Sequence, residues 1–393
     1  MLAPTKELIF LGFKLNTETM KITLPENKAV EVKQLCVELV QTEKPSIRQV
    51  AKVIGKIIST FPAVQYGPLF YRTLEREKID ALRMNKGHFD RKMVLSAEAK
   101  SELHWWIENV TSSFAPIRRA KPDLELRTDA SGTGWGATNL KSSTGGRWNE
   151  QESRKARNNG INYLETLAAG FGIKSFCANV QNLHVLIRMD NTTAVTYLNN
   201  MGGTKSLDCN EAAKNIWKWC MCRNIWISAA HLPGKLNTEA DHMSRQFNDR
   251  TEWMLNKHMF QQITHHFGHP DIDLFASRLN KQVDRYVSWR CEPEAEAVDA
   301  FSIDWKSLNF YAFPPFCLIS KCLQKIKCDD ARGLLVVPNW PTQPWFPLLK
   351  SMLVEEPMFI SKSIDLLTQP VTGEPHPLHN QLDLLCCRCC ANP

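Results

Sequence analysis

The stretch Arg127-Thr-Asp-Ala-Ser-Gly-Thr-Gly-Trp-Gly136 decides the fold of the middle of this 393-residue chain. Just before it, Leu124-Glu-Leu-Arg-Thr128 alternates apolar and polar residues, which is typical of a half-buried strand. This strand would end at Asp129, and the small residues and glycines that follow would permit a tight turn. A second strand is predicted over residues 135–140.

Two further acidic residues stand within a predicted helix and directly after a predicted strand, respectively. Glu165 lies in Asn162-Tyr-Leu-Glu-Thr-Leu-Ala168, where apolar residues recur at helical spacing. Asp190 follows the apolar run Val185-Leu-Ile187, which fits a buried strand. A helix is predicted directly after it, with Asn191 or Thr192 as the N-cap.

A fourth carboxylate, Asp241, closes the stretch His231-Leu-Pro-Gly-Lys-Leu-Asn-Thr-Glu-Ala-Asp241. Residues 225–229 predict a strand, its loop would carry His231, and the following helix would hold Asp241. Four carboxylates in these settings predict a cage for two Mg²⁺ ions, because Mg²⁺ prefers oxygen ligands. Such a cage cuts phosphodiesters by in-line attack of water, with one ion activating the nucleophile and the other stabilising the leaving oxygen.

Residues 122–247 resemble a type-1 RNase H domain of a retroelement. The resemblance rests on the order Asp, Glu, Asp, Asp and on the ending His-x-Pro-Gly-x-x-Asn-x-x-Ala-Asp-x-x-Ser-Arg over residues 231–245. It implies a mixed five-stranded sheet with flanking helices. It also implies that the metal ligands, for two Mg²⁺ ions with Mn²⁺ as the alternative, are Asp129, Glu165, Asp190 and Asp241.

The same resemblance gives His231 a part in product release, and Asn237 would orient the final loop. The alternative for His231 is an ordinary solvated loop histidine. An RNA–DNA hybrid would be recognised by its A-form-like shape and its 2′-hydroxyl groups. Gly132 and Gly134, through Gly136, would let the nucleic-acid backbone approach, with Asn237 as a further contact.

The residues before this domain predict a hairpin followed by two helices. Leu8-Ile-Phe-Leu-Gly-Phe-Lys-Leu15 and Met20-Lys-Ile-Thr-Leu24 would pair across a turn. Pro25 would open the first helix, and Ser46 with Gln49 forms a capping-box signature for the second. Basic residues recur every four positions there: Lys44, Arg48, Lys52 and Lys56. Such a stripe can follow a phosphate backbone, although a solvated helix face is its commoner meaning.

This segment resembles the end of a reverse transcriptase. Residues 1–24 would be a primer-grip-like hairpin at the end of the palm, and residues 25–115 would be thumb and connection. In that family the polymerase aspartates precede the hairpin, and no Tyr-x-Asp-Asp occurs in this sequence. We therefore expect a truncated polyprotein without polymerase activity, whose natural partner would be a reverse transcriptase polymerase portion.

Three apolar runs in the last third predict a smaller α/β region over residues 263–368. They are Asp271-Ile-Asp-Leu-Phe-Ala276, Asn309-Phe-Tyr-Ala-Phe-Pro-Pro-Phe316 and Gly333-Leu-Leu-Val-Val-Pro338. Their order is similar to the region after RNase H in DIRS-type (tyrosine-recombinase) retrotransposons, which resembles a DNA N6-adenine methyltransferase. Asp273 would stand near the first cofactor strand, and Phe313 would replace the polar residue of the active-site loop. Because the glycine-rich cofactor turn is also missing, we expect a degenerate region without methylation activity.

Composition favours a soluble protein of the cytoplasm or nucleus that is not secreted. The 48 Lys+Arg exceed the 41 Asp+Glu by 7, which weakly favours a nucleic-acid partner. No stretch is long and apolar enough to span a bilayer, and the first residues lack a signal-peptide pattern. Four of the 13 cysteines crowd the end of the chain: Cys386, Cys387, Cys389 and Cys390. Their spacing is too tight for one metal site, so we expect residues 369–393 to be a disordered tail.

The predicted fold class is therefore α/β and α+β multidomain. A helical thumb/connection precedes the RNase H-like domain, and a smaller α/β region follows it. Two functions remain open. One is a Mg²⁺-dependent endoribonuclease that cuts RNA in RNA–DNA hybrids, which the four carboxylates favour. The other is a catalytically silent, nucleic-acid-binding remnant of a retrotransposon, which the missing palm and the unusual tail favour.

Overall fold

The computed structural model describes residues 5–247 and 252–392. Residues 1–4 of the expected segment 1–24, and residue 393 of the expected tail, lie outside the described part. Contacts group the chain into two units. The first is Met1–Glu125, Asn158–Leu167 and Gln181–Pro233, and the second is Leu126–Arg157, Ala168–Val180 and Gly234–Pro393. Among the described residues, no helix has both the length and the apolar character needed to cross a membrane.

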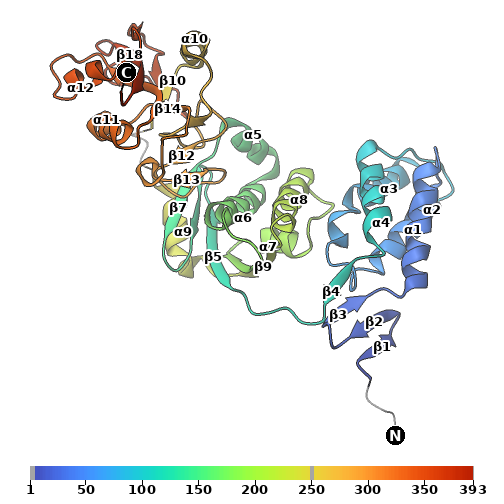
Figure 1. Cartoon of the computed structure of the whole chain (residues 1–393). Helices are drawn as coiled ribbons and strands as arrows, with labels where there is room; N and C mark the ends of the chain where they lie inside the picture. Colours follow the sequence, from blue (N-terminus) through green and yellow to red (C-terminus); the bar gives the residue numbers. More distant parts are fainter. Residues whose placement is uncertain (1–4, 248–251, 393) are drawn as a thin grey trace. The chain divides into compact units, whose positions relative to one another are not determined.

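A four-stranded antiparallel sheet opens the first unit, in the order β1-β2-β3-β4 (Figure 1). Its strands are β1 (Glu7–Phe10), β2 (Phe13–Asn16), β3 (Lys21–Thr23) and β4 (Phe114–Pro116). The expected strand over residues 8–15 is split, because Leu11 and Gly12 form a turn with φ angles of 49° and 77°. Two successive positive φ angles suit a tight hairpin. β1 and β2 therefore form a short hairpin of their own, where the sequence predicted one continuous strand over residues 8–15.

Four helices of the first unit share one hydrophobic core. They are α1 (Glu26–Gln41), α2 (Ile47–Ile58), α3 (Arg72–Met84) and α4 (Ala97–Asn109). The capping box predicted for α2 is present: Ser46 accepts the N–H of Gln49, and the Gln49 side chain accepts the N–H of Ser46 at 2.8 Å. The apolar residues of α2 are buried at helical spacing: Ile47, Val50, Val53, Ile54 and Ile57. Both signals in the sequence therefore position this helix.

A mostly buried ion pair joins this helical core to helix α8 (Leu207–Met221). Lys214 Nζ lies 2.9 Å from Glu102 Oε1, with side chains that are 11% and 2% exposed. Glu102 also accepts the backbone N–H groups of Thr73 and Leu74 at the start of α3. A buried carboxylate with a cation and two N–H donors is well satisfied, so this contact fixes α3, α4 and α8 to one another.

The second sheet has five strands in the order β7-β6-β5-β8-β9. The strands are β5 (Leu124–Ala130), β6 (Gly134–Thr138), β7 (Ser143–Arg147), β8 (His184–Met189) and β9 (Trp226–His231). The helices of this segment, besides α8, are α5 (Glu150–Asn159), α6 (Ile161–Cys177), α7 (Thr192–Asn199) and α9 (Thr238–Arg245). β5, β6 and β7 are antiparallel, whereas β8 and β9 are parallel. This mixed five-stranded sheet with flanking helices is RNase H-like, as the sequence implied.

Helix α9 lies directly against β6 and β7, at positions where these strands carry glycine. A Cβ added to Gly136 would lie 2.1 Å from the carbonyl O of Ala240, and one added to Gly145 would lie 2.5 Å from that of Met243. Any side chain at these positions would push α9 off the sheet. The glycines therefore make room for the helix that carries Asp241.

The C-terminal region of the second unit is built on a sheet in the order β11-β14-β15-β18-β16. The strands are β11 (Ile272–Asp273), β14 (Phe310–Ala312), β15 (Arg332–Pro338), β16 (Met358–Ile360) and β18 (Leu384–Cys390). β11, β14 and β15 are parallel, and β18 is antiparallel to both of its neighbours. Two short pairs complete the strands, β10 (Met254–Leu255) with β17 (Leu367–Thr368) and β12 (Val287–Ser288) with β13 (Ala297–Val298).

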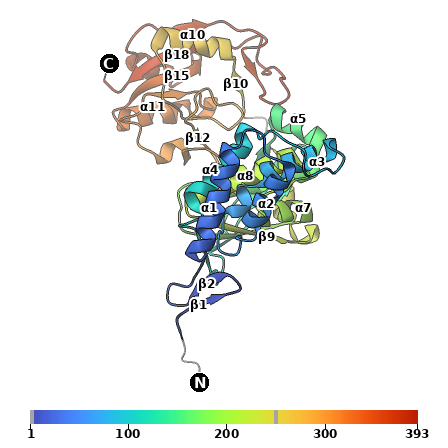
Figure 2. The same cartoon turned by 90° about the vertical axis from the view of Figure 1, so that its right-hand side faces the viewer.

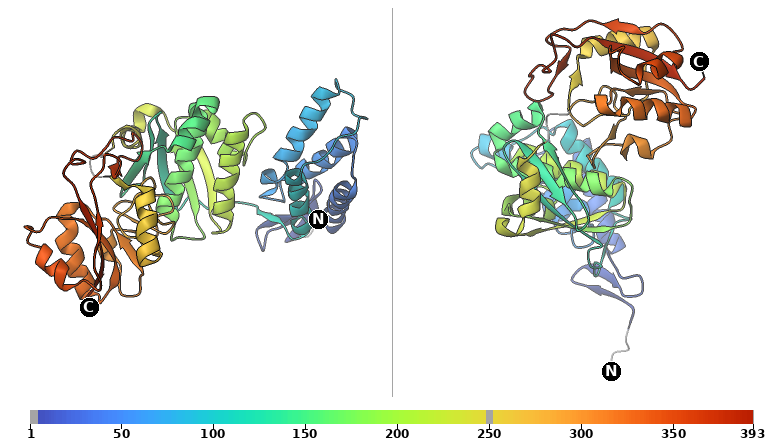
Figure 3. Two further views of the ribbon diagram at one scale, coloured as in Figure 1. Left: turned by 90° about the horizontal axis from the view of Figure 1, so that it is seen from above. Right: turned by 90° about the vertical axis from the view of Figure 1, so that its left-hand side faces the viewer.

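Helices cover both faces of this sheet, as Figure 2 shows for the labelled elements and Figure 3 from two other sides. Residues of α10 (Lys257–Phe267) share one hydrophobic cluster with the sheet. Residues of α11 (Ile319–Cys328) and α12 (Phe346–Ser351) share another cluster, with the alternate residues of the strands. The region is thus an α/β arrangement of three layers, the class expected for the region after the RNase H-like domain. Its sheet includes β18, beyond the expected end at residue 368.

Strand β18 corrects the expectation that residues 369–393 form a disordered tail. Cys386 packs in the cluster of α10, whereas Cys387 and Cys389 pack in the cluster of α11 and α12. All three side chains are 0% exposed. A free cysteine behaves as a small hydrophobic residue, so the crowded cysteines are core residues of an inner strand.

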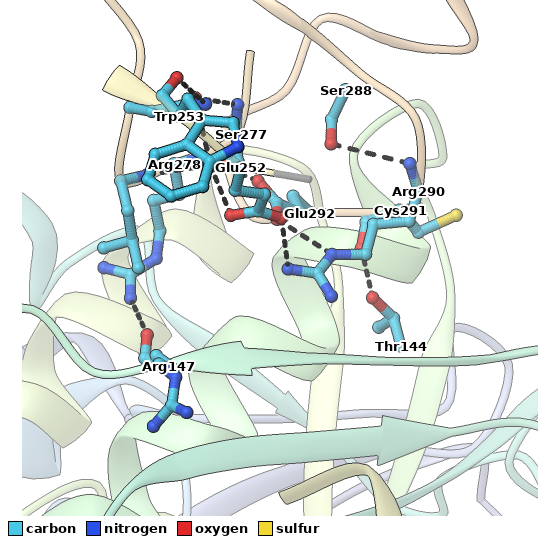
Figure 4. Close-up of polar contacts among 12 residues, drawn as sticks. Thr144, Arg147, Glu252, Trp253, Ser277, Arg278, Ser288, Arg290, Cys291 and Glu292 are labelled. Atoms are coloured by element: carbon cyan, nitrogen blue, oxygen red, sulfur yellow. Dashed lines mark hydrogen bonds and ion pairs between the residues drawn. The ribbon is translucent and has the colours of Figure 1, made fainter. Parts of the chain in front are cut away.

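A polar network joins the C-terminal region to β7 and α5 (Figure 4). Arg278 Nη1 lies 2.7 Å from Glu152 Oε1, and its Nη2 donates to the carbonyl O of Arg147 at 2.7 Å. The Thr144 hydroxyl donates to the carbonyl O of Cys291. These contacts cover strand β7, which is an edge strand of the five-stranded sheet.

Candidate metal centre and nucleic-acid site

Asp129 stands near the end of β5, where the sequence placed it, and its side chain is 6% exposed. The strand is held to α9 at this point, because the Ser244 hydroxyl donates to Asp129 Oδ2 at 2.7 Å. One carboxylate oxygen of Asp129 therefore has a fixed direction before any ion binds.

Glu165 and Asp190 come from α6 and from the residue after β8. The two elements are tied by Asn191, whose side-chain amide donates to Asn162 Oδ1 at 2.9 Å while its Oδ1 caps α7. Glu165 is 3% exposed and Asp190 is exposed. One of these carboxylates is therefore buried and the other faces solvent.

The structure brings three of the four predicted ligands together. Asp129, Glu165 and Asp190 each offer one carboxylate oxygen, and these oxygens all lie within 4.8 Å of one another. Three carboxylates this close repel one another strongly, most of all where two of them are buried. A bound cation relieves that repulsion, and an all-oxygen donor set suits a hard divalent ion such as Mg²⁺. The residues present therefore fit the implied metal.

Asp241 is not part of that group of three. It lies on α9, and its Oδ1 accepts a hydrogen bond from Arg245 Nε at 2.7 Å. The two side chains are 44% and 59% exposed, respectively. Of the four carboxylates expected to form the cage, three are thus grouped, and the fourth, Asp241, is paired with the guanidinium of Arg245.

His231 and Asn237 occupy different environments. His231 is the last residue of β9 and is exposed, so it ends the strand and does not lie in the following loop. Asn237 is 2% exposed and donates from its side-chain amide to the carbonyl O of Thr128 at 2.9 Å. Asn237 therefore ties the loop before α9 to β5. Its burial corrects the expectation that it contacts nucleic acid directly.

The glycines after Asp129 also differ in their environments. Gly132 is exposed, and a Cβ added there would meet nothing within 4 Å. Gly134 is buried, and a Cβ there would lie 2.3 Å from Cζ of Phe247. Gly134 and Gly136 thus make room for protein rather than for a nucleic-acid backbone, which corrects the expectation for Gly134. Gly132 keeps an open surface.

The basic stripe on α2 is partly neutralised. Arg48 forms an ion pair with Asp90 at 2.8 Å, and Lys56 forms one with Glu31 at 2.6 Å. Lys44 precedes the helix, and both Lys44 and Lys52 are exposed. The positive potential available for phosphate contacts is therefore smaller than the sequence count suggested.

A cavity of about 610 Å³ opens in the C-terminal region, beyond the carboxyl ends of β11 and β14. Its walls include the predicted Phe313–Phe316 loop and three residues that sequence reasoning missed, Trp253, Trp289 and His376. Ligands commonly bind at the carboxyl ends of parallel strands. A predicted strand order could therefore have indicated this edge of the sheet, but it could not have indicated these three residues. Asp273 does not line the cavity: its carboxylate accepts the backbone N–H groups of Phe275 and Gln282.

No protein-family model matches the sequence, and no curated protein matches it. Solved structures similar to the chain include RNase H1 from the halophilic archaeon Halobacterium salinarum NRC-1, which is 16% identical, with a TM-score of 0.24 and coverage of 30% of this chain and 92% of that one. LC11-RNase H1 in complex with an RNA/DNA hybrid is 20% identical, with a TM-score of 0.23 and coverage of 31% and 93%.

A third structure is the dRH form of the foamy viral protease-reverse transcriptase in complex with double-stranded DNA. It is 11% identical, with a TM-score of 0.25, and the match covers 57% of this chain but only 38% of that protein. At these identities and TM-scores, an argument about function rests on the geometry of the site itself.

Proposed function

We propose that the chain is a ribonuclease H, which hydrolyses the RNA strand of RNA–DNA hybrids endonucleolytically and depends on Mg²⁺, with Mn²⁺ as the alternative ion. The observation that supports this most is the group Asp129, Glu165 and Asp190, whose carboxylate oxygens lie within 4.8 Å of one another on an RNase H-like sheet. An acidic group of this kind suits two-metal phosphodiester hydrolysis.

The roles of the metal-binding side chains would follow from their burial. Bound divalent ions would supply the activated water and stabilise the leaving oxygen. Asp129 and Glu165, which are 6% and 3% exposed, would hold their oxygens in fixed directions. Asp190 is exposed and would face the scissile phosphate. Asp241 would join as the fourth ligand after leaving Arg245.

Recognition of the hybrid would rest on its A-form-like shape and on contacts to its backbone and 2′-hydroxyl groups. Gly132 offers an open turn next to Asp129, and Lys44 and Lys52 offer exposed charges. His231, exposed at the end of β9, keeps its proposed part in product release.

The wider proposal is that the sequence belongs to a retroelement polyprotein, with residues 25–115 as thumb and connection. The alternative is a catalytically silent remnant that binds nucleic acid only. The observation behind this alternative is that Asp241 is not part of the group of three and pairs with Arg245.

For residues 263–368 the proposal remains a degenerate methyltransferase-like region of DIRS type. The parallel strands β11, β14 and β15 beside the antiparallel β18, and the cavity of about 610 Å³, support it. Phe313 has no polar group to hold an amine, so no methyl transfer is expected. Titration with S-adenosylmethionine in a calorimeter should give no saturable heat, and a saturable heat would contradict this.

The test of the main proposal is cleavage of a labelled RNA strand, in a hybrid and alone, by the full chain with Mg²⁺. We expect the hybrid RNA to be cut and single-stranded RNA to be spared. Asp129→Asn and Asp190→Asn should each abolish cutting, and Asp123→Asn, which changes an acid just before the start of β5 and outside the group, should keep it. A folded parent protein that binds the hybrid without cutting it would leave only the silent remnant.

A further inference from the structure

Helix α9 contacts two of the predicted ligands through two neighbouring residues. Ser244 is 0% exposed, and its hydroxyl lies 2.7 Å from Asp129 Oδ2 and 2.9 Å from the carbonyl O of Asp241. A hydroxyl has one proton to donate. A charged acceptor at the shorter distance takes that proton more strongly, so the hydrogen bond to Asp129 dominates.

The position of Ser244 is itself fixed by the fold. The Ser131 hydroxyl donates to the carbonyl O of Ser244 at 2.6 Å, and Trp148 Nε1 donates to the carbonyl O of Ser131 at 2.9 Å. Gly136, opposite in β6, leaves room for the backbone of Ser244, because a Cβ there would lie 2.7 Å from the Ser244 nitrogen. Ser244 therefore cannot drift away from Asp129 without moving α9.

The next residue, Arg245, contacts the other predicted ligand, Asp241, through an ion pair. Its guanidinium pairs with Asp241 at 2.7 Å on the exposed side of the helix. A guanidinium and a divalent cation compete for the same carboxylate oxygens. An exposed pair of this spacing is weak, so a cation of higher charge can displace it.

We propose that Ser244 and Arg245 impose an order on metal binding at this site. Ser244 is a positioning residue that orients Asp129 for the first ion, and Arg245 keeps Asp241 engaged until a second ion arrives. The inference rests on the proposed nuclease site and adds its regulation: one ion binds tightly to the resting protein, and the second binds more weakly because it must displace Arg245.

The test is a titration of the full chain with MnCl₂ alone, without nucleic acid, followed by calorimetry and by electron paramagnetic resonance of free Mn²⁺. Arg245→Met keeps the aliphatic stem and removes the charge. It should tighten the second ion about twofold, the size expected for an exposed pair of this spacing, and leave the first unchanged. Arg154→Met, which removes another exposed i,i+4 pair, with Glu150, should change neither ion.

Ser244→Ala should weaken the first ion about tenfold, the scale found when a group that orients a metal ligand is lost. Ser244→Thr restores the hydroxyl and should recover most of that affinity. Ser288→Ala, which removes another buried hydroxyl in the C-terminal region, should have no effect. Thermal unfolding of each variant checks that the protein remains folded, so that a change in metal affinity is not a loss of fold.

The proposal fails if Arg245→Met leaves the second ion unchanged, or if Ser244→Ala leaves the first unchanged in folded protein. These outcomes are separate from a failure of the nuclease proposal. Ordered metal binding without hybrid cleavage would retain the inference and remove the nuclease, whereas cleavage with unaltered isotherms would do the reverse.

Discussion

Arg278 of the C-terminal region forms a two-point ion pair with Glu152 of α5, with Nη1–Oε1 at 2.7 Å and Nη2–Oε2 at 3.2 Å. The side chains are 12% and 14% exposed. The same guanidinium lies over the ring of Phe171 in α6, 4.7 Å from its centroid. One residue that follows β11 therefore helps to hold two helices that flank the RNase H-like sheet.

Replacing Arg278 by Met should destabilise the second unit by about 3 kcal/mol, because removal of one partner leaves a mostly buried carboxylate without its cation. Urea-induced unfolding followed by tryptophan fluorescence measures the change. Arg154→Met is the control, because its pair with Glu150 is 69% and 83% exposed and should contribute little. Equal losses of unfolding free energy in the two variants would show that burial does not strengthen the Arg278–Glu152 ion pair.

Gly136→Ala should destabilise the protein by about 2 kcal/mol, the usual scale for overpacking a filled contact. The new methyl group would lie 2.1 Å from the carbonyl O of Ala240, so α9 must shift. Gly132→Ala has open space around it and should leave the unfolding free energy nearly unchanged. If Gly136→Ala proves as stable as Gly132→Ala in the same denaturation experiment, α9 does not lie against β6 as described.

Stability should depend on pH through Asp273. Burial raises the pKa of Asp273 to about 7, above the value of about 3.9 in an unfolded chain. Between these values the folded protein holds a proton that the unfolded chain has lost, so the unfolding free energy contributed by this group falls as pH rises from about 4 to about 7. Below that window both states are protonated, and above it both are ionised.

The measurement is the difference in unfolding free energy between the parent and Asp273→Asn at pH 5 and at pH 8. Asparagine loses one acceptor for the N–H groups of Phe275 and Gln282 at both pH values, so that loss cancels in the comparison. We expect the variant to gain stability relative to the parent at pH 8. A difference that is the same at both pH values would show that Asp273 is not protonated in the folded protein.

Thiol labelling should follow burial rather than position in the chain. Burial raises the pKa of the Cys386 and Cys389 thiols well above the ordinary value, and a protonated, enclosed thiol reacts slowly. Iodoacetamide should modify the exposed cysteines first: Cys222, Cys317 and Cys328. Peptide mass spectrometry distinguishes the sites, and rapid native labelling of Cys386 or Cys389 would place β18 outside the core.

The three grouped carboxylates could be located from the sequence because each stands in an element whose pattern is local. The alternation before Asp129, the helical spacing around Glu165 and the apolar run before Asp190 each predict one element without reference to the rest of the chain. What the sequence could not indicate is the pairing of Asp241 with Arg245, since it depends on the directions of two long, exposed side chains.

Two of the elements that were missed, β7 and α5, lack such patterns. Strand β7 has the sequence Ser-Thr-Gly-Gly-Arg, in which glycine serves the approach of α9 and no apolar residue marks a buried face. Helix α5 has no buried residue at all, so it shows no amphipathic stripe. Strand β18 was misjudged because its cysteines were considered only as metal ligands, whereas here they fill a core.

The place of β18 between β15 and β16 has a consequence for biosynthesis. Residues 384–390 emerge from the ribosome after every other strand of their sheet, yet they form its inner strand. Until they are released, β16 has no partner in that sheet and one edge of β15 is open. A nascent chain would therefore hold an incomplete sheet whose apolar faces could bind chaperones. Insertion of β18, a strand of cysteines and leucines, would complete the sheet in a single late step.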